Sequence, residues 1–146
     1  MDNDRFVLPS LKASIEELSD DMQVIWTTSD GGQTVSNCLT ASTRPKVLLA
    51  DMSMEGVSGI SVCRRIRTRI GKVGILAMTA YSIDRYAEKA SMAGAQGIVG
   101  KSDDQQIVTD PHHRLRRDVG RGIRDRPDRA CAAEEPDLRQ RRADRP

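Results

Sequence analysis

The sequence has few aromatic residues and few cysteines. One Trp, two Tyr and one Phe make up 3% of its 146 residues, so a packed core has to be built mainly from aliphatic side chains. The three cysteines, Cys38, Cys63 and Cys131, are an odd number at wide spacing. This pattern predicts reduced thiols and argues against a disulfide framework or a zinc site.

Long apolar runs are absent as well. Runs such as residues 47–50 and 75–78 are far shorter than the roughly 20 residues of a membrane-spanning helix. The chain opens with Met1-Asp2-Asn3-Asp4, which is acidic where a secretion signal is basic, and no long apolar stretch follows. We therefore expect a cytoplasmic protein with no membrane contact.

Composition divides the chain near Val108. Residues 109–146 hold eleven arginines, eight acidic residues and four of the six prolines, with no Lys, Ser, Met or aromatic residue. Such a segment cannot form a packed face, and its interleaved acids and missing aromatics argue against nucleic-acid binding. We predict a folded domain over 1–108 and a disordered or frameshifted tail over 109–146, and we expect no DNA binding from this chain.

Residues 1–108 alternate between helical and strand patterns. Apolar residues at three- and four-residue spacing predict helices at 8–18, 35–39, 60–70 and 83–93. Short apolar runs predict strands at 22–27, 47–50, 73–79 and 98–99. Strands that alternate with helices in this way form parallel βαβ units. The sequence therefore predicts an α/β fold with a doubly wound parallel sheet.

Three side chains of complementary chemistry stand where predicted strands end. Asp51 follows the run 47–50, Thr79 closes the next strand, and Lys101 stands two residues after Val99. Because the carboxyl ends of parallel strands meet at one edge of a sheet, we expect these side chains to converge. A carboxylate nucleophile flanked by a hydroxyl and a cation suits phosphoryl transfer.

Oxygen-bearing side chains also crowd the amino terminus. Asp2, Asn3 and Asp4 precede the first predicted helix, and they offer oxygen ligands of the kind that Mg²⁺ prefers. The alternative is that they are only the solvated start of a helix, where acidic residues interact favourably with the helix dipole. The sequence leaves both interpretations open.

Three motifs resemble the receiver domain of two-component response regulators. Residues 48–59 resemble its phosphoacceptor strand and loop, Met78-Thr79-Ala80 its threonine segment, and residues 94–101 its lysine segment. Ser102-Asp103 resembles regulators of the LuxR type, which have a helix-turn-helix output. The resemblance covers residues 2 to about 108. It implies a flavodoxin-like fold and a phosphorelay role in transcription regulation, with a sensor histidine kinase as the partner.

The resemblance also implies roles for single residues. Asp51 would accept a phosphoryl group from the kinase phosphohistidine, and Thr79 and Lys101 would bind the phosphoryl oxygens. The metal would be Mg²⁺, held by Asp2, Asn3, Asp51 and the backbone carbonyl of Ser53.

Signal output would use the face formed by the fourth helix, the last strand and the last helix, which includes Tyr86 and Ile98. A homodimer would form through the same last strand and helices. Since the family has an aromatic residue where this chain has Ile98, we expect no aromatic rotamer switch.

Both ends of the predicted domain depart from the family. Asn3 stands where an acid is expected, the first strand would have to precede Asp2, and Pro111 interrupts the last helix. We hypothesise that the domain lacks most of its first strand and is truncated at both ends. The tail is typical of GC-rich DNA translated in another frame.

Two alternative functions follow from these departures. The chain would be a receiver-like interaction module that accepts no phosphate, or a degraded gene product without activity. A third function, an aspartate-nucleophile phosphatase, requires a second carboxylate two residues after the first as general acid. Ser53 stands there, so we expect no enzyme.

Overall fold

The computed structural model describes residues 1–54 and 56–110. Its elements are α1 (Val7–Leu18), α2 (Gly31–Leu39), β1 (Val47–Asp51), α3 (Gly59–Arg67), β2 (Gly74–Thr79), α4 (Ile83–Met92), β3 (Gly97–Gly100) and α5 (Asp104–Asp110). The three strands form a parallel sheet in the order β1-β2-β3. The predicted α/β class with a parallel sheet is therefore confirmed, whereas Pro111 and the remainder of the predicted tail lie outside the described residues.

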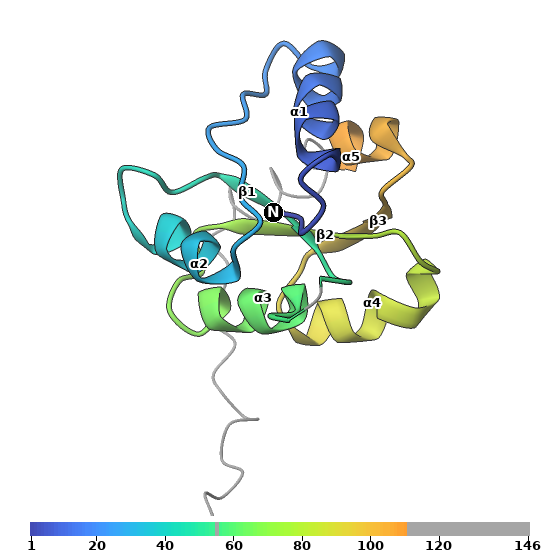
Figure 1. The fold of residues 1–146 in the computed structure, drawn as a ribbon. Helices are drawn as coiled ribbons and strands as arrows, with labels where there is room; N and C mark the ends of the chain where they lie inside the picture. The colour runs from blue at the N-terminus through green and yellow to red at the C-terminus, as the bar shows by residue number, and fades with distance from the viewer. Residues whose placement is uncertain (55, 111–146) are drawn as a thin grey trace, which may run out of the picture.

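Helices cover both faces of the sheet. Figure 1 shows α2, α3 and α4 along one face, while α1 and α5 lie together on the other. Side chains of the strands alternate between these two layers. None of the described helices is both long and apolar enough to cross a membrane.

Two apolar clusters fill the space between sheet and helices. The central strand β2 is buried along its whole length. The α2–α4 cluster contains Met1, Val35, Cys38, Leu48, Ala50, Met52, Met54, Val62, Cys63, Ile66, Val73, Ile75, Ala77, Ala90 and Ala93. The α1–α5 cluster contains Ile15, Leu76, Met78, Val99, Ile107 and Val108. As predicted from the scarcity of aromatics, these buried cores are aliphatic and sulfur-containing.

Short polar side chains begin two of the helices. Asp30 accepts a hydrogen bond from the backbone N–H of Gln33 at the start of α2, and Ser58 accepts one from Ser61 at the start of α3. Each such cap satisfies a backbone donor that the first turn leaves unpaired. The next residue, Gly59, packs so closely under β1 that a Cβ atom would lie 1.9 Å from the carbonyl oxygen of Asp51.

The strand predicted at residues 22–27 is wrong. Residues 22–28 form no strand, although Met22, Val24 and Trp26 are partly buried and alternate with exposed residues as a strand pattern requires. A strand needs a neighbour to satisfy its backbone groups. Within the described residues, the segment has two backbone hydrogen bonds, one at each end. Met22 donates to the carbonyl oxygen of Ser19 at 3.3 Å in a local turn, and Asp2 donates to the carbonyl oxygen of Thr28 at 3.2 Å.

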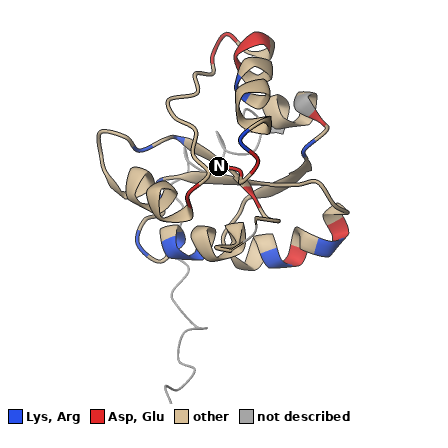
Figure 2. Cartoon of the chain, in the orientation of Figure 1, with Lys and Arg blue, Asp and Glu red and all other residues tan. Residues whose placement is uncertain are grey.

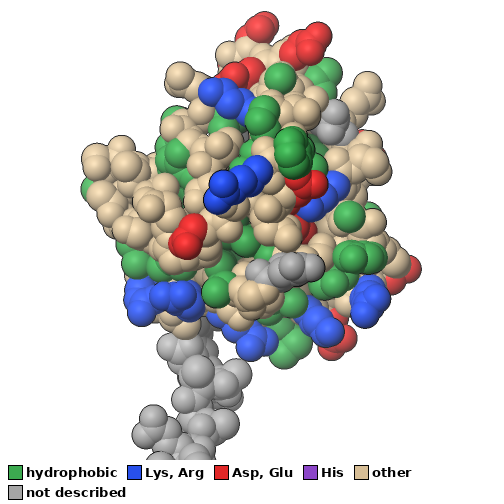
Figure 3. All heavy atoms as spheres, viewed as in Figure 1, with side chains coloured by type: hydrophobic (Ala, Val, Ile, Leu, Met, Phe, Trp, Pro, Cys, Tyr) green, Lys and Arg blue, Asp and Glu red, His purple; other side chains and the backbone are tan. Residues whose placement is uncertain are grey.

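Charged residues gather on the outer surfaces of the helices. Figure 2 marks Lys and Arg positions along α3 and α4 and acidic positions at the far end of α1, and Figure 3 shows the Lys and Arg side chains on the surface of that lower side. On α3, Arg64 and Arg65 are exposed, whereas Ile66 is buried. The helix is therefore amphipathic, with its apolar side toward the sheet.

Candidate functional site

Asp51 is the last residue of β1, and its carboxylate is buried at the carboxyl end of the sheet. Only 1% of the residue is exposed. Its Oδ1 accepts two hydrogen bonds from Ser53, one from the backbone N–H at 3.0 Å and one from the hydroxyl at 2.9 Å. The turn after β1 therefore holds Oδ1 of Asp51 in place, whereas Oδ2 makes no hydrogen bond to the described residues of this turn.

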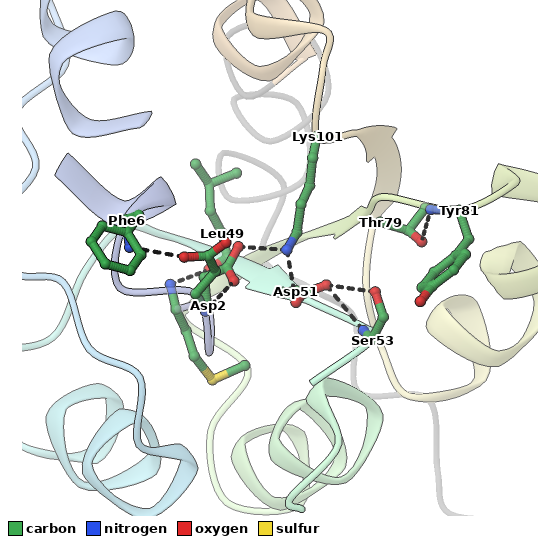
Figure 4. A network of polar contacts seen from close by, with 10 residues as sticks. Asp2, Phe6, Leu49, Asp51, Ser53, Thr79, Tyr81 and Lys101 are labelled. Atoms are coloured by element: carbon green, nitrogen blue, oxygen red, sulfur yellow. Dashed lines mark hydrogen bonds and ion pairs between the residues drawn. The ribbon is translucent and has the colours of Figure 1, made fainter. Parts of the chain in front are cut away.

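Lys101 joins this carboxylate to a second one. It follows β3 directly, and its backbone N–H donates to the carbonyl oxygen of Thr79 at 2.9 Å. Its Nζ lies 2.9 Å from Oδ2 of Asp51 and 2.7 Å from Oδ2 of Asp2 (Figure 4). The three side chains come from a loop, β1 and the end of β3, and they form one buried ionic cluster.

The ionic cluster changes the pKa of Lys101. Burial lowers this pKa, but the hydrogen bonds and negative charges of Asp2 and Asp51 outweigh the burial and raise it above its ordinary value. The lysine therefore carries a positive charge throughout the physiological pH range. Two carboxylates face this single ammonium group.

Asp2 is fully buried and is positioned through its own loop. Its Oδ1 accepts a hydrogen bond from the backbone N–H of Asp4 at 2.9 Å. Apart from the ion pair with Lys101, its Oδ2 has no hydrogen-bond partner among the described residues. A buried carboxylate oxygen with unused acceptor capacity is suited to a cation.

These observations fit a Mg²⁺ site. Mg²⁺ in proteins commonly uses one or two carboxylates and completes its coordination shell with water and phosphate oxygens. Asp2 and Asp51 supply two such carboxylates beside one ammonium group. Over the residues described, no group of three or more His, Cys, Asp or Glu side chains could hold a metal, so these two acids would have to be supplemented by backbone, amide or water oxygens.

Two of the predicted site residues are not joined to this ionic cluster. The hydroxyl of Thr79 is buried and accepts a hydrogen bond from the backbone N–H of Tyr81 at 3.0 Å, and Figure 4 shows this pair beside the cluster. Asn3 is exposed at the surface. The structure thus brings Asp2, Asp51, Ser53 and Lys101 together and leaves Thr79 and Asn3 apart.

The two residues predicted on the output face are both partly buried. Tyr86 on α4 and Ile98 on β3 pack against the α2–α4 cluster. The ring of Tyr86 lies 6.3 Å from that of Tyr81, centre to centre. Since Tyr81 also donates its backbone N–H to Thr79, a continuous set of contacts leads from Thr79 to Tyr86.

The backbone of Met1 is a part of the site that sequence reasoning missed. Its terminal nitrogen donates to the carbonyl oxygen of Leu49 at 2.9 Å, and its own carbonyl oxygen accepts from the N–H of Asp51 at 3.1 Å. Burial lowers the pKa of this amine to about 6, although the charges of Asp2 and Asp51 oppose the shift. No sequence pattern indicates that Met1 lies beside the edge strand β1.

Comparison with known proteins identifies the family of the chain. The chain matches the response regulator receiver domain over residues 1–110. It is 29% identical over 108 residues to the oxygen regulatory protein NreC of Staphylococcus haemolyticus, covering 73% of this chain and 49% of that protein. It is 31% identical over 104 residues to the Fimbriae Z protein of Escherichia coli, covering 68% of this chain and 48% of that protein. The chain thus spans about half the length of these curated relatives.

Solved structures of response regulators share the fold of this chain. A LuxR-family two-component response regulator from Aurantimonas sp. SI85-9A1 is 27% identical, with a TM-score of 0.71 over 84% of this chain and 90% of that one. The receiver domain of the putative regulator NarL from Mycobacterium tuberculosis has a TM-score of 0.66 at 22% identity, covering 75% of this chain and 86% of that one, which shows the fold alone. The family match, the LuxR-type relatives and the parallel sheet together establish that the chain belongs to the response regulator receiver domain family.

Proposed function

We propose that this receiver domain accepts a phosphoryl group on Asp51 from a sensor histidine kinase. The single observation that carries the proposal is the ionic cluster at the ends of two strands, in which Lys101 bridges the buried carboxylates of Asp51 and Asp2. A carboxylate that faces a fixed cation in a site shielded from water is well placed for nucleophilic attack on phosphorus.

In this reaction an oxygen of Asp51 forms a bond to phosphorus as the P–N bond to the kinase histidine breaks. Ser53 holds Oδ1 through its N–H and hydroxyl, so the carboxylate has a defined orientation. The ammonium of Lys101 then stabilises charge on the transferred phosphoryl oxygens. Thr79 supplies a hydroxyl at the end of the neighbouring strand. Its oxygen accepts from the N–H of Tyr81, which leaves its O–H free to donate to a phosphoryl oxygen.

Mg²⁺ would bind to the carboxylates of Asp2 and Asp51. The carbonyl oxygen of Ser53, the side chain of Asn3 and water would be the further ligands. When bound, it would neutralise charge on the phosphoryl oxygens. Movement of Thr79 toward the phosphoryl group would displace Tyr81, and the displacement would then reach Tyr86 and Ile98 as a shift between two packings of the output face. Within a longer regulator that face would form the homodimer.

Intact-mass spectrometry tests the proposal. The 146-residue chain is incubated with Mg²⁺ and a small-molecule phosphodonor, beside Asp51→Asn and beside Asp84→Asn, which removes an exposed carboxylate on α4. We expect one acid-labile phosphate on the parent chain and on Asp84→Asn, and none on Asp51→Asn. Equal labelling of all three would contradict Asp51 as acceptor, and no labelling of any would favour the receiver-like interaction module.

A further inference from the structure

The four residues of β3, Gly97–Gly100, specify their own register only weakly. Ile98 packs against the α2–α4 cluster, and Val99 is buried in the α1–α5 cluster. A slip of one residue along β2 would exchange these two side chains between the faces of the sheet and leave both faces apolar. The register of β3 therefore has to be set by residues outside the strand.

The register of β3 decides where Lys101 lies. Gly100 pairs with Thr79 at the end of the strand. Lys101 follows, and its Nζ lies 2.7 Å from the carboxylate of Asp2 and 2.9 Å from that of Asp51 (Figure 4). A slip of one residue would move the lysine by about 3.3 Å and turn its side chain to the other face of the sheet. Lys101 would then leave the ionic cluster.

Gln96 joins the amino end of β3 to β2 by two hydrogen bonds. Its backbone N–H donates to the carbonyl oxygen of Ile75 at 2.9 Å, and its side-chain Oε1 accepts from the N–H of Ile75 at 2.7 Å. The neighbours Ala95 and Gly97 have no side-chain oxygen. A slip of β3 would therefore leave the N–H of the buried Ile75 without this acceptor, and an unpaired buried donor is costly.

Arg67, the last residue of α3, holds Gln96 in place. Its Nη2 donates to Oε1 of Gln96 at 3.3 Å and to the carbonyl oxygen of Gly94 at 2.8 Å, which also accepts from Nε at 3.1 Å. Its Nη1 donates to the carbonyl oxygens of Val73 at 3.0 Å and Gly71 at 3.3 Å. One guanidinium group thus joins the residues just before β2 to those just before β3.

The contact between Arg67 and Gly94 requires both residue types. Gly94 has a φ of +90°, and a Cβ atom there would lie 2.7 Å from Cγ and 2.9 Å from Nε of Arg67. Among the described residues, the guanidinium forms no salt bridge with a carboxylate, and its hydrogen bonds go to carbonyl and amide oxygens. The planar fork of arginine can serve several such acceptors at once, which a lysine cannot.

We propose that Arg67 and Gln96 are positioning residues of the phosphoacceptor site, which set the register of β3 and thereby hold Lys101 beside Asp51. Both lie at the amino end of the sheet, whereas the ionic cluster lies at its carboxyl end, and β3 connects the two. The effect on chemistry rests on the proposed phosphorylation of Asp51. The effect on the register does not depend on it.

The register is tested by NMR on the isotope-labelled 146-residue chain. The parent should show close backbone contacts between the paired residues of β2 and β3, Thr79 and Gly100 among them. In Gln96→Ala we expect these contacts to weaken and the amide of Ile75 to exchange with solvent about tenfold faster. Gln96→Glu keeps a side-chain oxygen as acceptor and should preserve both. Unchanged contacts and exchange in Gln96→Ala would overturn the proposal.

The consequence for the site is measured as the rate at which Mg²⁺ and a small-molecule phosphodonor label Asp51, normalised to the folded fraction. We expect Gln96→Ala and Arg67→Met to be labelled about tenfold more slowly than the parent. Arg64→Met, which removes an exposed guanidinium from the same helix, should be labelled at the parental rate. If Arg67→Met does not fold, Gln96→Ala decides, because it keeps the bonds of Arg67 to Gly94.

A double variant separates positioning from a merely structural role. If Gln96 acts through Lys101, labelling of the variant with both Gln96→Ala and Lys101→Met should be no slower than labelling of Lys101→Met alone. Losses that multiply would overturn the proposal, and so would parental labelling of a Gln96→Ala chain with altered strand contacts. If the parent itself is not labelled, the proposed phosphorylation is wrong, while the NMR contacts still decide the register.

Discussion

The segments that lie on the two sides of β1 have similar apolar sequences, but only one of them forms a strand. On one side β2 pairs with it at five positions and is buried throughout. On the other side residues 22–28 contain Met22, Val24, Ile25 and Trp26, an equally strand-like run, and yet form no strand. The difference teaches that an apolar, β-branched run becomes a strand only when a neighbour satisfies its backbone.

The largest contrast in stability should come from truncating one side chain on each side. Leu76→Ala removes a side chain that is 2% exposed in the centre of β2, and it should lower the free energy of unfolding by about 2–5 kcal/mol. Val24→Ala acts on a partly buried residue of the unpaired segment and should cost less than about 1 kcal/mol. Urea unfolding measures both, and equal losses would contradict the contrast.

The ionic cluster joins β1 to its unpaired side, because Asp51 is the last residue of β1 and Asp2 lies on the side of residues 22–28. Lys101→Met leaves their buried carboxylates facing each other without a cation. We expect the free energy of unfolding to fall by about 3 kcal/mol and millimolar Mg²⁺ to restore more stability than it adds to the parent. Thermal unfolding with and without Mg²⁺ measures this. A variant that does not respond to Mg²⁺ would contradict the magnesium site.

The packing of α3 under β1 gives a third test. In Gly59→Ala the new Cβ would meet the backbone of Asp51, so we expect a loss of about 2 kcal/mol together with slower phosphorylation of Asp51. Gly100→Ala on β3 is the matched control, since nothing lies within 4 Å of its Cβ position. Chemical unfolding compares the two variants, and similar losses would show that the close approach is relieved elsewhere.

The smallest effect is expected in the unpaired segment itself. The indole N–H of Trp26 donates to the carbonyl oxygen of Thr43 at 2.8 Å, a side-chain tether where a strand would have ladder bonds. Trp26→Phe should cost about 1 kcal/mol and speed proteolysis within residues 22–28. Ile25→Ala is the control, because Ile25 is 54% exposed and should change neither. Unchanged proteolysis in Trp26→Phe would show that the tether does not hold the segment.

Much of the fold could be predicted because its signals are local. The apolar spacing predicted α1, α3 and α4, and the runs at 47–50 and 73–79 became β1 and β2. The strand at 22–27 was predicted on the same grounds and is wrong. A periodic pattern reports which face of a segment is apolar, but whether a neighbour is present depends on residues far away in the chain.

The site shows the same division. The sequence by itself determined that Asp51 and Lys101 end parallel strands and therefore meet. Only the tertiary structure decided that Asp2 joins them while Asn3 stays at the surface and the hydroxyl of Thr79 binds Tyr81. Parallel pairing brings the carboxyl ends of the strands to one edge of the sheet, so residues at these ends can be placed from the sequence. The direction of a side chain depends instead on the burial and hydrogen bonds that only the folded chain provides.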